Sequence, residues 1–264
     1  MLIERISDAS DSRISIYKDL KDKDLRSTNS FIIEGKFILE TLLTRSKFKI
    51  SSVFITEDRL IPLETMLARV PADIPVYVTT HEIMTEIAGY NVHRGILAAG
   101  HADQTQNNLP AYLNDHDPIA VLSNISNPDN IGAIFRNAAG LGIKAVLLDT
   151  QCCSPLYRKA IRVSMGATLV LPWVQAGSIG ELIEHLIATD FTIYALSLQS
   201  ATNLEDVQFS GRSAFVFGEE AHGLPPHVQA LCKAITIPME AGTDSLNVAA
   251  TSAIVFDAAR RQKT

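Results

Sequence analysis

Short runs of apolar residues that alternate with amphipathic segments constrain the fold of this chain most strongly in its second half. Runs that are largely apolar, and are therefore expected to be strands, lie at residues 119–122, 144–149, 168–171, 192–198 and 213–217. Segments expected to be helices lie between them, at residues 131–139, 154–165 and 179–188. Near-continuous apolar strands are typical of a parallel sheet that helices cover on both sides. The pattern predicts an α/β fold with such a parallel sheet.

The first hundred residues show a second alternation of expected strands and short helices. Strands are expected at residues 31–35, 51–56, 75–79 and 95–100, and helices at residues 13–26, 36–45, 60–70 and 81–87. The polar stretch DQTQNNLPAYLNDHD, which has a proline and no periodicity, then interrupts the pattern. We therefore expect a small α/β domain over residues 1–103, a linker over 104–117 and a second α/β domain over 118–264.

Composition argues against several classes of protein. Hydrophobic residues make up 47% of the 264 residues, so the chain can bury a sizeable core and does not resemble a disordered protein. No apolar run reaches the roughly 18 residues of a membrane span, and the charges in MLIERISDAS do not suit a secretory signal. The three cysteines form neither a disulfide framework nor a zinc-binding spacing. We expect a cytoplasmic protein without a metal site.

The charge balance limits how the chain would bind nucleic acid. Its formal net charge is −6, whereas proteins that bind nucleic acid often carry a basic excess, because phosphate contacts dominate their affinity. RNA binding would therefore need local basic patches or the help of a partner. The densest basic cluster of the second half is Arg158, Lys159 and Arg162, close to one face of an expected helix. These residues are candidates for RNA contact, and a solvated or interface face is the alternative.

The loop at residues 123–130, after the first strand of the second domain, indicates what this domain does not bind. It lacks the glycine fingerprint with which a Rossmann fold approaches a dinucleotide pyrophosphate, which disfavours a nucleotide-dependent oxidoreductase. Asn130 is placed to cap the helix expected from Ile131, and Arg136 lies about a turn and a half further on. On spacing alone, a capped helix with a surface arginine explains these residues as well.

Two further segments follow the ends of expected strands, the edge at which open α/β sheets bind ligands. In the first, Gly218 ends a strand and Glu220 lies in the acidic turn after it; a capped loop is the alternative. In the second, a strand-like segment leads through a polar turn into the last helix, which Ser245 or Asn247 is placed to cap. Such a corner of small side chains and free backbone donors suits a polar ligand.

Together these segments resemble the SpoU/TrmH family of RNA ribose 2′-O-methyltransferases over residues 118–263. The first motif, Asn-x5-Arg, is Asn130 and Arg136; the second, Gly-x-Glu-x-x-Gly-Leu, spans residues 218–224. The third, Ile-Pro-Met and Ser-Leu-Asn-Val, is residues 237–239 and 245–248. Ala241 stands where the family usually has glycine, and Gly242 follows it. The first hundred residues resemble the family's small α/β RNA-binding extension more loosely.

The resemblance implies a homodimeric, S-adenosylmethionine-dependent enzyme that methylates a ribose 2′-hydroxyl of tRNA or rRNA. It also implies that the C-terminal domain is folded into a deep trefoil knot, which sequence rules alone do not predict. Carried over by position, the residues expected to bind the cofactor are Leu196, Gly218, Ile237 and Leu246. Those expected to line the methyl-transfer site are Asn130, Arg136, Glu220, Ser245 and Asn247.

The resemblance also implies a role for Arg136, since the arginine of the first motif is usually proposed as the catalytic base. A guanidinium is rarely deprotonated in proteins, so we expect Arg136 to orient the ribose-phosphate and stabilise the incipient alkoxide, whether or not it takes the proton. A non-catalytic RNA-binding or assembly protein that keeps the fold is the alternative function.

Overall fold

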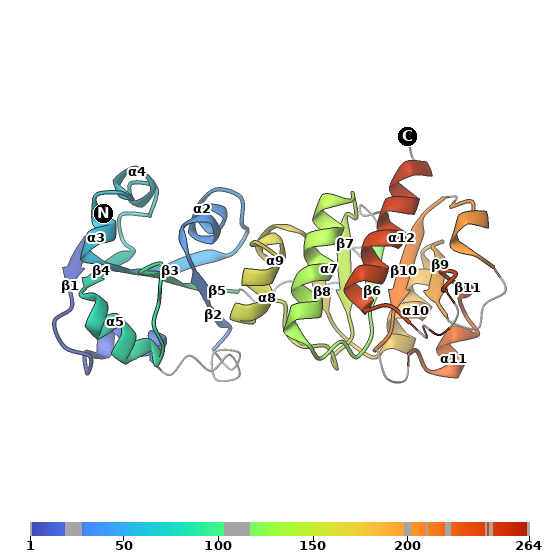
Figure 1. Cartoon of the computed structure of the whole chain (residues 1–264), viewed down its shortest axis with the longest axis horizontal. Coiled ribbons are helices and arrows are strands. Elements are labelled where there is room, and N and C mark those ends of the chain that lie inside the picture. Colours follow the sequence, from blue (N-terminus) through green and yellow to red (C-terminus); the bar gives the residue numbers. More distant parts are fainter. Residues whose placement is uncertain are drawn as a thin grey trace. The chain divides into compact units, whose positions relative to one another are not determined.

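The computed structural model describes residues 2–18, 28–102, 117–197, 202–209, 211–219, 223–240, 242 and 245–262. Its packing divides the chain into two compact units (Figure 1). The first consists of Met1–Gln104 together with Leu156–Val170, and the second of Thr105–Pro155 together with Leu171–Thr264. The segment Leu156–Val170 thus packs with the first unit, although the chain on either side of it belongs to the second.

The first unit is built on a mixed sheet. Its described strands follow the order β1-β4-β3-β5-β2, with β5 antiparallel to β2 and β3, and β4 parallel to β1 and β3. The strands are β1 (Leu2–Arg5), β2 (Ser30–Glu34), β3 (Lys49–Thr56), β4 (Pro75–Thr79) and β5 (Ile96–His101). The helices are η1 (Ser12–Tyr17), α2 (Lys36–Thr44), α3 (Glu57–Leu60), α4 (Glu64–Leu67), α5 (His81–Ala88), α8 (Arg158–Val163) and α9 (Ala167–Val170).

The core of the first unit is organised around Tyr17. Its ring is fully buried and lies 5.1 Å, centroid to centroid, from that of Phe54. Its hydroxyl lies 2.7 Å from the Ser52 hydroxyl and accepts a hydrogen bond from the Ala99 amide at 3.1 Å, so the polar end is satisfied inside the core. Burial raises the pKa of Tyr17 above its ordinary value.

The second unit is built on an all-parallel sheet, as the apolar runs predict. Its described strands follow the order β11-β9-β10-β6-β7-β8. The strands are β6 (Ile119–Leu122), β7 (Ala145–Leu148), β8 (Trp173–Gln175), β9 (Thr192–Leu196), β10 (Ser213–Phe217) and β11 (Lys233–Ile235). The helices are α7 (Pro128–Gly140), α10 (Ile179–Ala188), η3 (Leu204–Asp206), α11 (Pro226–Gln229) and α12 (Val248–Gln262).

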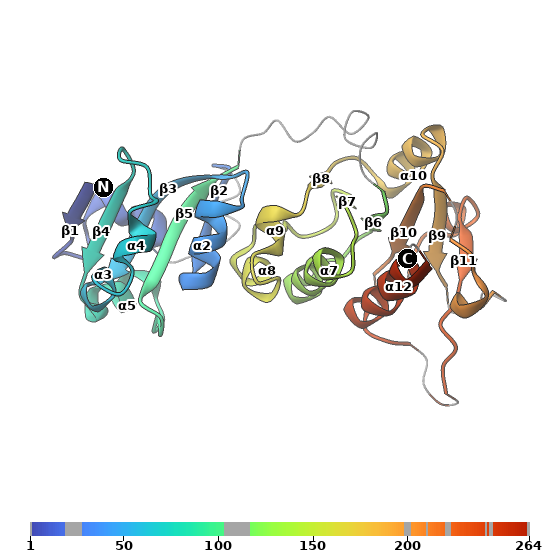
Figure 2. The same cartoon turned by 90° about the horizontal axis from the view of Figure 1, so that it is seen from above.

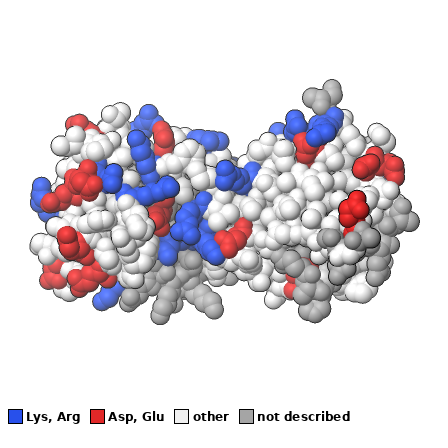
Figure 3. All heavy atoms as spheres, in the orientation of Figure 1, with Lys and Arg blue, Asp and Glu red and all other residues white. Residues whose placement is uncertain are grey.

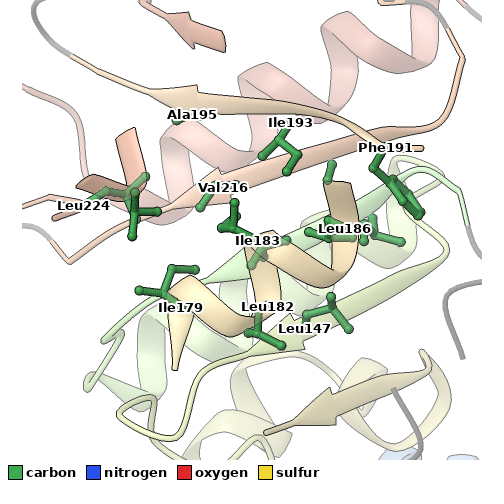
Figure 4. Close-up of a cluster of buried hydrophobic side chains, with 14 of the residues drawn as sticks. Leu147, Ile179, Leu182, Ile183, Leu186, Phe191, Ile193, Ala195, Val216 and Leu224 are labelled. Carbon is green, nitrogen blue, oxygen red and sulfur yellow. The ribbon is translucent and has the colours of Figure 1, made fainter. Parts of the chain in front are cut away.

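Helices cover both faces of this parallel sheet. On one face Ile183 and Leu186 of α10 pack into a cluster with Ile193 and Val216 (Figure 4). On the other face α7 and α12 lie side by side (Figures 1 and 2), and the buried ring of Phe256 on α12 meets that of Phe217 at 5.5 Å. Successive residues of a strand point to opposite faces, so β10 contributes to both clusters.

Some expected elements differ in the structure. The helix expected over residues 60–70 is two short helices, α3 and α4, because Pro62 lies between them and has no N–H to donate. The strand expected over 168–171 is the helix α9, since Thr168 and Leu169 are buried in the first unit, and β8 takes the place beside β7. β1 was not expected. Of the helix expected over 13–26, only η1 and Lys18 fall within the described residues.

Two expectations about the chain path stay predictions. The linker expected over residues 104–117 lies, apart from Asp117, outside the described residues. The trefoil knot that the family resemblance implies is likewise still a prediction. Within the described part of the chain, no helix has the length and apolar character needed to cross a membrane, and no group of three or more metal-binding side chains occurs.

Replacing Phe256 with alanine tests the packing of α12 on the parallel sheet. The ring is fully buried, so its loss is expected to destabilise the second unit by about 3–5 kcal/mol. Urea unfolding followed by circular dichroism measures the change. The matched control is Phe37→Ala, because the Phe37 side chain is 48% exposed and its loss is expected to cost less than about 0.5 kcal/mol. Equal stabilities of the two variants would contradict the packing described here.

Candidate functional site

Three of the expected cofactor residues come together at one edge of the parallel sheet. Parallel strands end at the same edge, and β9 lies between β10 and β11. Leu196 ends β9 opposite Ile235 of β11, Gly218 directly follows β10, and Ile237 lies two residues beyond β11. The structure thus brings Leu196, Gly218 and Ile237 to the carboxyl edge, where ligands of such sheets bind.

Gly218 is a position at which only glycine fits. A Cβ atom there would lie 2.5 Å from the carbonyl carbon of Gly223 and 2.8 Å from the Leu224 nitrogen, too close for any side chain. The chain turns back on itself here, and the Gly223 amide donates to the Glu219 carbonyl at 2.9 Å. Glu220, the expected acidic residue of this turn, lies outside the described residues.

Asn130 does not cap a helix, contrary to the sequence-based expectation. The helix α7 begins three residues earlier, at Pro128, because proline's fixed φ and missing donor suit the first helical position. Asn127 is the cap, and its side-chain oxygen accepts from the Asp129 amide at 2.9 Å. Asn130 lies in the first turn, 6% exposed, and its Oδ1 atom accepts a hydrogen bond from Asn247 Nδ2 at 3.0 Å.

Asn247 connects the first and third motifs. Its Oδ1 atom accepts from the Ala249 amide at 2.9 Å, which is the capping bond expected at the start of α12. Its Nδ2 atom donates to Asn130, on α7. Sequence reasoning missed a second connection, in which Asn137 Nδ2 donates to the Ala249 carbonyl at 2.8 Å and to Ser252 Oγ at 3.0 Å. These bonds hold the corner before α12 and the start of α12 itself against α7.

A hydrogen-bonded network around Asp149 was also missed. Asp149 directly follows β7, and its carboxylate accepts from the Ser123 hydroxyl at 2.9 Å and from the Asn124 amide at 3.1 Å. The Asn124 backbone has a φ of 55°, and its side-chain Nδ2 donates to Glu219 Oε2 at 2.5 Å. The network therefore connects the loop before α7 to the residue after Gly218. An aspartate at the end of a buried strand is the signal that could have indicated it.

The remaining expected residues of this edge are exposed. Arg136 is an exposed residue of α7. Ser245 and Leu246, the latter 38% exposed, directly precede Asn247. In the turn before them, Ala241 lies outside the described residues, while Gly242 has a φ of 90°, a conformation that favours glycine.

The three basic residues proposed for RNA contact lie on α8, in the first unit. Arg158 is partly buried, its Nη1 atom donates to the Tyr90 hydroxyl at 2.6 Å, and its guanidinium carbon lies 4.7 Å from the centre of the Tyr90 ring. The Tyr90 hydroxyl donates to Glu34 Oε2 at 3.2 Å. Burial raises the pKa of Tyr90 to about 12 although Arg158 opposes the shift, so the phenol keeps its proton. Lys159 and Arg162 are exposed.

Comparison with known proteins places this geometry in context. A model of the SpoU rRNA Methylase family matches residues 117–257. An uncharacterized tRNA/rRNA methyltransferase of Mycobacterium tuberculosis is 32% identical over 264 residues, covering 96% of this chain and 90% of the relative. The 23S rRNA (guanosine-2′-O-)-methyltransferase RlmB of Salmonella typhimurium is 27% identical over 245 residues, covering 89% and 100% respectively. The crystal structure of an AdoMet-bound rRNA methyltransferase from Sinorhizobium meliloti has a TM-score of 0.86 at 19% identity, with 99% of each chain covered.

The two-unit α/β fold and the motifs at the edge of its parallel sheet are those of an RNA methyltransferase. Because the family model matches more than half of the residues and relatives are over 30% identical along nearly the whole chain, the chain belongs to the SpoU rRNA methylase family.

The hydrogen bond from Asn124 to Glu219 can be tested by exchanging the donor and the acceptor between the two side chains. Asn124→Asp removes the hydrogen-bond donor and places a second carboxylate against Glu219. At pH values above 7, where the two carboxylates repel each other, the second unit is expected to lose about 1–3 kcal/mol of stability. The double variant Asn124→Asp, Glu219→Gln exchanges donor and acceptor and is expected to recover most of the lost stability. Urea unfolding of the single and double variants measures both effects.

The control is Asn127→Asp, in the same loop. A carboxylate there can still accept from the Asp129 amide at the start of α7, so stability is expected to stay within about 0.5 kcal/mol. A double variant that is as unstable as Asn124→Asp would show that the Asn124–Glu219 bond does not join the two loops.

Proposed function

We propose that the chain is an S-adenosylmethionine-dependent methyltransferase that acts on a ribose 2′-hydroxyl of tRNA or rRNA. The observation that carries the proposal is the hydrogen bond between Asn247 and Asn130, which joins the third and first motifs. They meet at the sheet edge that also holds Gly218. The relatives' names support the substrate class, since one is a tRNA/rRNA methyltransferase and another a 23S rRNA (guanosine-2′-O-)-methyltransferase.

The residues of this edge fit S-adenosylmethionine. No side chain can stand at Gly218, because the backbone of Gly223 and Leu224 packs directly against it, so the edge after β10 is formed by tightly folded main chain. Leu196, Ile237 and Leu246 supply apolar side chains that are not fully buried and suit the adenine of the cofactor. When bound, S-adenosylmethionine supplies a methyl group on a positively charged sulfonium. Its presence in the Sinorhizobium meliloti structure is consistent with the same cofactor here.

The residues of the chain then position and stabilise the nucleophile. Negative charge develops on the ribose 2′-oxygen as its bond to the methyl carbon forms and its proton leaves. We assign to Arg136 the binding of the ribose-phosphate and the stabilisation of this charge. Asn130 and Asn247 hold α7 against the corner before α12, and Glu220 and Ser245 complete the methyl-transfer site. Holding the hydroxyl in line with the methyl group supplies much of the rate, because the sulfonium is already electrophilic.

Two further parts of the proposal concern the assembly. The first unit, with residues 1–103 as its main part, is the RNA-binding domain, and Arg158, Lys159 and Arg162 of α8 belong to its RNA-binding region. The chain acts in the cytoplasm as a homodimer through the catalytic domain of residues 118–264. Arg136, Ser245 and Leu246 are exposed in a single copy, and Ile254 on α12 is 40% exposed, which supports a contact there. Sedimentation of the full chain tests the dimer.

Arg136→Ala tests the assignment of charge stabilisation. Turnover on total RNA is expected to fall by about 10²–10³-fold, as for the loss of one stabilising donor, while the dissociation constant for S-adenosylmethionine stays unchanged. Calorimetry and a radiolabelled methyl-transfer assay measure the two quantities separately. Lys144→Ala, which removes another exposed cation of the second unit, is the control. Turnover equal to that of the parent, or turnover lost only because cofactor no longer binds, would refute the role.

The substrate is identified by mapping 2′-O-methylated nucleotides in RNA from cells with and without the gene. A position that loses its methyl group names the RNA and the nucleotide. Cofactor binding without methyl transfer to any RNA would favour the alternative of a non-catalytic RNA-binding protein.

A further inference from the structure

We propose that one face of the first unit binds a single-stranded segment of RNA, one of whose bases stacks on Phe37. The phosphates of the same segment lie against Lys36, Arg94 and Arg162. We call these four residues the stacking surface. The proposal rests on the proposed function in taking RNA as the substrate, and it adds which kind of RNA structure the first unit recognises and through which residues.

The first part of the stacking surface forms where α2 begins. Gly35 precedes α2 with a φ of 94°, and the side chain of Arg94 lies directly against it. A Cβ atom at Gly35 would be 3.2 Å from Arg94 Cδ and 3.3 Å from its Nη1. The guanidinium of Arg94 therefore lies beside the first residues of α2, Lys36 and Phe37. All three of these side chains are exposed.

The second part is the basic helix α8, which Tyr90 and Arg158 hold against the same region. Glu34, the residue before Gly35, accepts the hydrogen bond of the Tyr90 hydroxyl, and that hydroxyl accepts from Arg158. Arg162 follows Arg158 by about one helical turn, and its charge reaches Tyr90, where it favours a lower pKa of the phenol. Arg158 thus positions the helix, while Arg162, on the next turn, presents its charge to solvent.

The far end of this helical segment also packs on α2. A Cβ atom at Gly166, just after α8, would lie 3.2 Å from the Thr41 side chain of α2. The Thr41 hydroxyl in turn donates a hydrogen bond to the Phe37 carbonyl, one helical turn earlier. Phe37 and Thr41 are four residues apart and so share one face of α2. Phe37 therefore lies on the side of α2 that faces the segment carrying Arg162.

An exposed aromatic ring among cations is the combination that single-stranded RNA requires. Phe37 is 48% exposed, whereas the other phenylalanines of the first unit, Phe31, Phe48 and Phe54, are buried. Lys and Arg side chains gather on this face of the first unit, over α2 and α8 (Figure 3). Unpaired bases stack on aromatic side chains while basic groups follow the backbone, and a base within a duplex cannot reach such a ring. The surface supplies the local positive charge that a chain of net charge −6 needs to bind RNA.

The test measures binding of the full chain to a labelled single-stranded RNA of mixed sequence, about 12 nucleotides long, at several salt concentrations. Phe37→Ala is expected to weaken binding by about 5- to 100-fold without changing the salt dependence, because a stacking contact carries no charge. Phe37→Tyr, which keeps the ring, is expected to bind like the parent. Arg94→Ala combined with Arg162→Ala is expected to flatten the slope of log K against log salt by about 1.4, the value for two phosphate contacts on a single strand.

Matched controls and a second ligand decide the outcome. Ile61→Ala removes an apolar side chain that is 84% exposed in the same unit, and Arg69→Ala removes an exposed arginine after α4; both are expected to bind like the parent. Phe37→Ala that binds RNA as tightly as the parent would overturn the proposal. The proposal would also be overturned if an RNA duplex of the same sequence bound as tightly as the single strand and lost as much affinity in Phe37→Ala. A changed oligomeric state of Phe37→Ala would overturn it too, because Phe37 would then lie in a contact between protein chains.

The two proposals fail in different ways. The proposed function fails if the parent chain does not bind S-adenosylmethionine or transfers no methyl group. The stacking surface fails if the parent binds both cofactor and RNA, but RNA binding does not respond to Phe37. Cofactor binding by Phe37→Ala, measured by calorimetry, is expected to equal that of the parent.

Discussion

The geometry of the candidate site depends on the carboxylate of Asp149. It is 3% exposed, and a charge buried to this extent is tolerated only where hydrogen-bond donors surround it. The Ser123 hydroxyl and the backbone amides of Asn124 and Cys152 supply those donors. They fix the loop between β6 and α7, from which Asn124 reaches Glu219. The loops after β6, β7 and β10 are thereby joined, and the start of α7 has a fixed place at the sheet edge.

Much of the second unit could be predicted because local patterns determine it. The runs at residues 119–122 and 213–217 are β6 and β10 with the expected bounds, since strands buried on both faces must be apolar throughout. The helix at residues 179–188 is α10, which begins with a capping box between Ser178 and Glu181. Gly218 was identified as a glycine at the end of a strand and Asn247 as a candidate cap, and the family resemblance added their expected roles. The structure places Gly218 directly after β10 and Asn247 directly before α12, where it caps the helix.

The misses have a common physical origin in contacts between distant residues. Asn130 was expected to cap a helix because its own side chain has the right chemistry, yet its partner, Asn247, lies 117 residues further along the chain. The run at residues 168–171 has strand-like composition, but tertiary packing made it α9. The hydrogen bond and ring contact that Arg158, a candidate RNA contact, makes with Tyr90 were not expected either. Local periodicity carries no information on such partners.

The membership of Leu156–Val170 in the first unit has a consequence for how this protein can change over evolution. The N-terminal unit is not a self-contained cassette, because α8 and α9, which complete it, are encoded inside the sequence of the methyltransferase domain. If recombination after β5 replaced the N-terminal part of the chain, the new part would have to pack against α8 and α9, whose surfaces fit the old one. Since β2 contacts α8 and α2 contacts α9, a change on one side of these contacts is expected to need a matching change on the other.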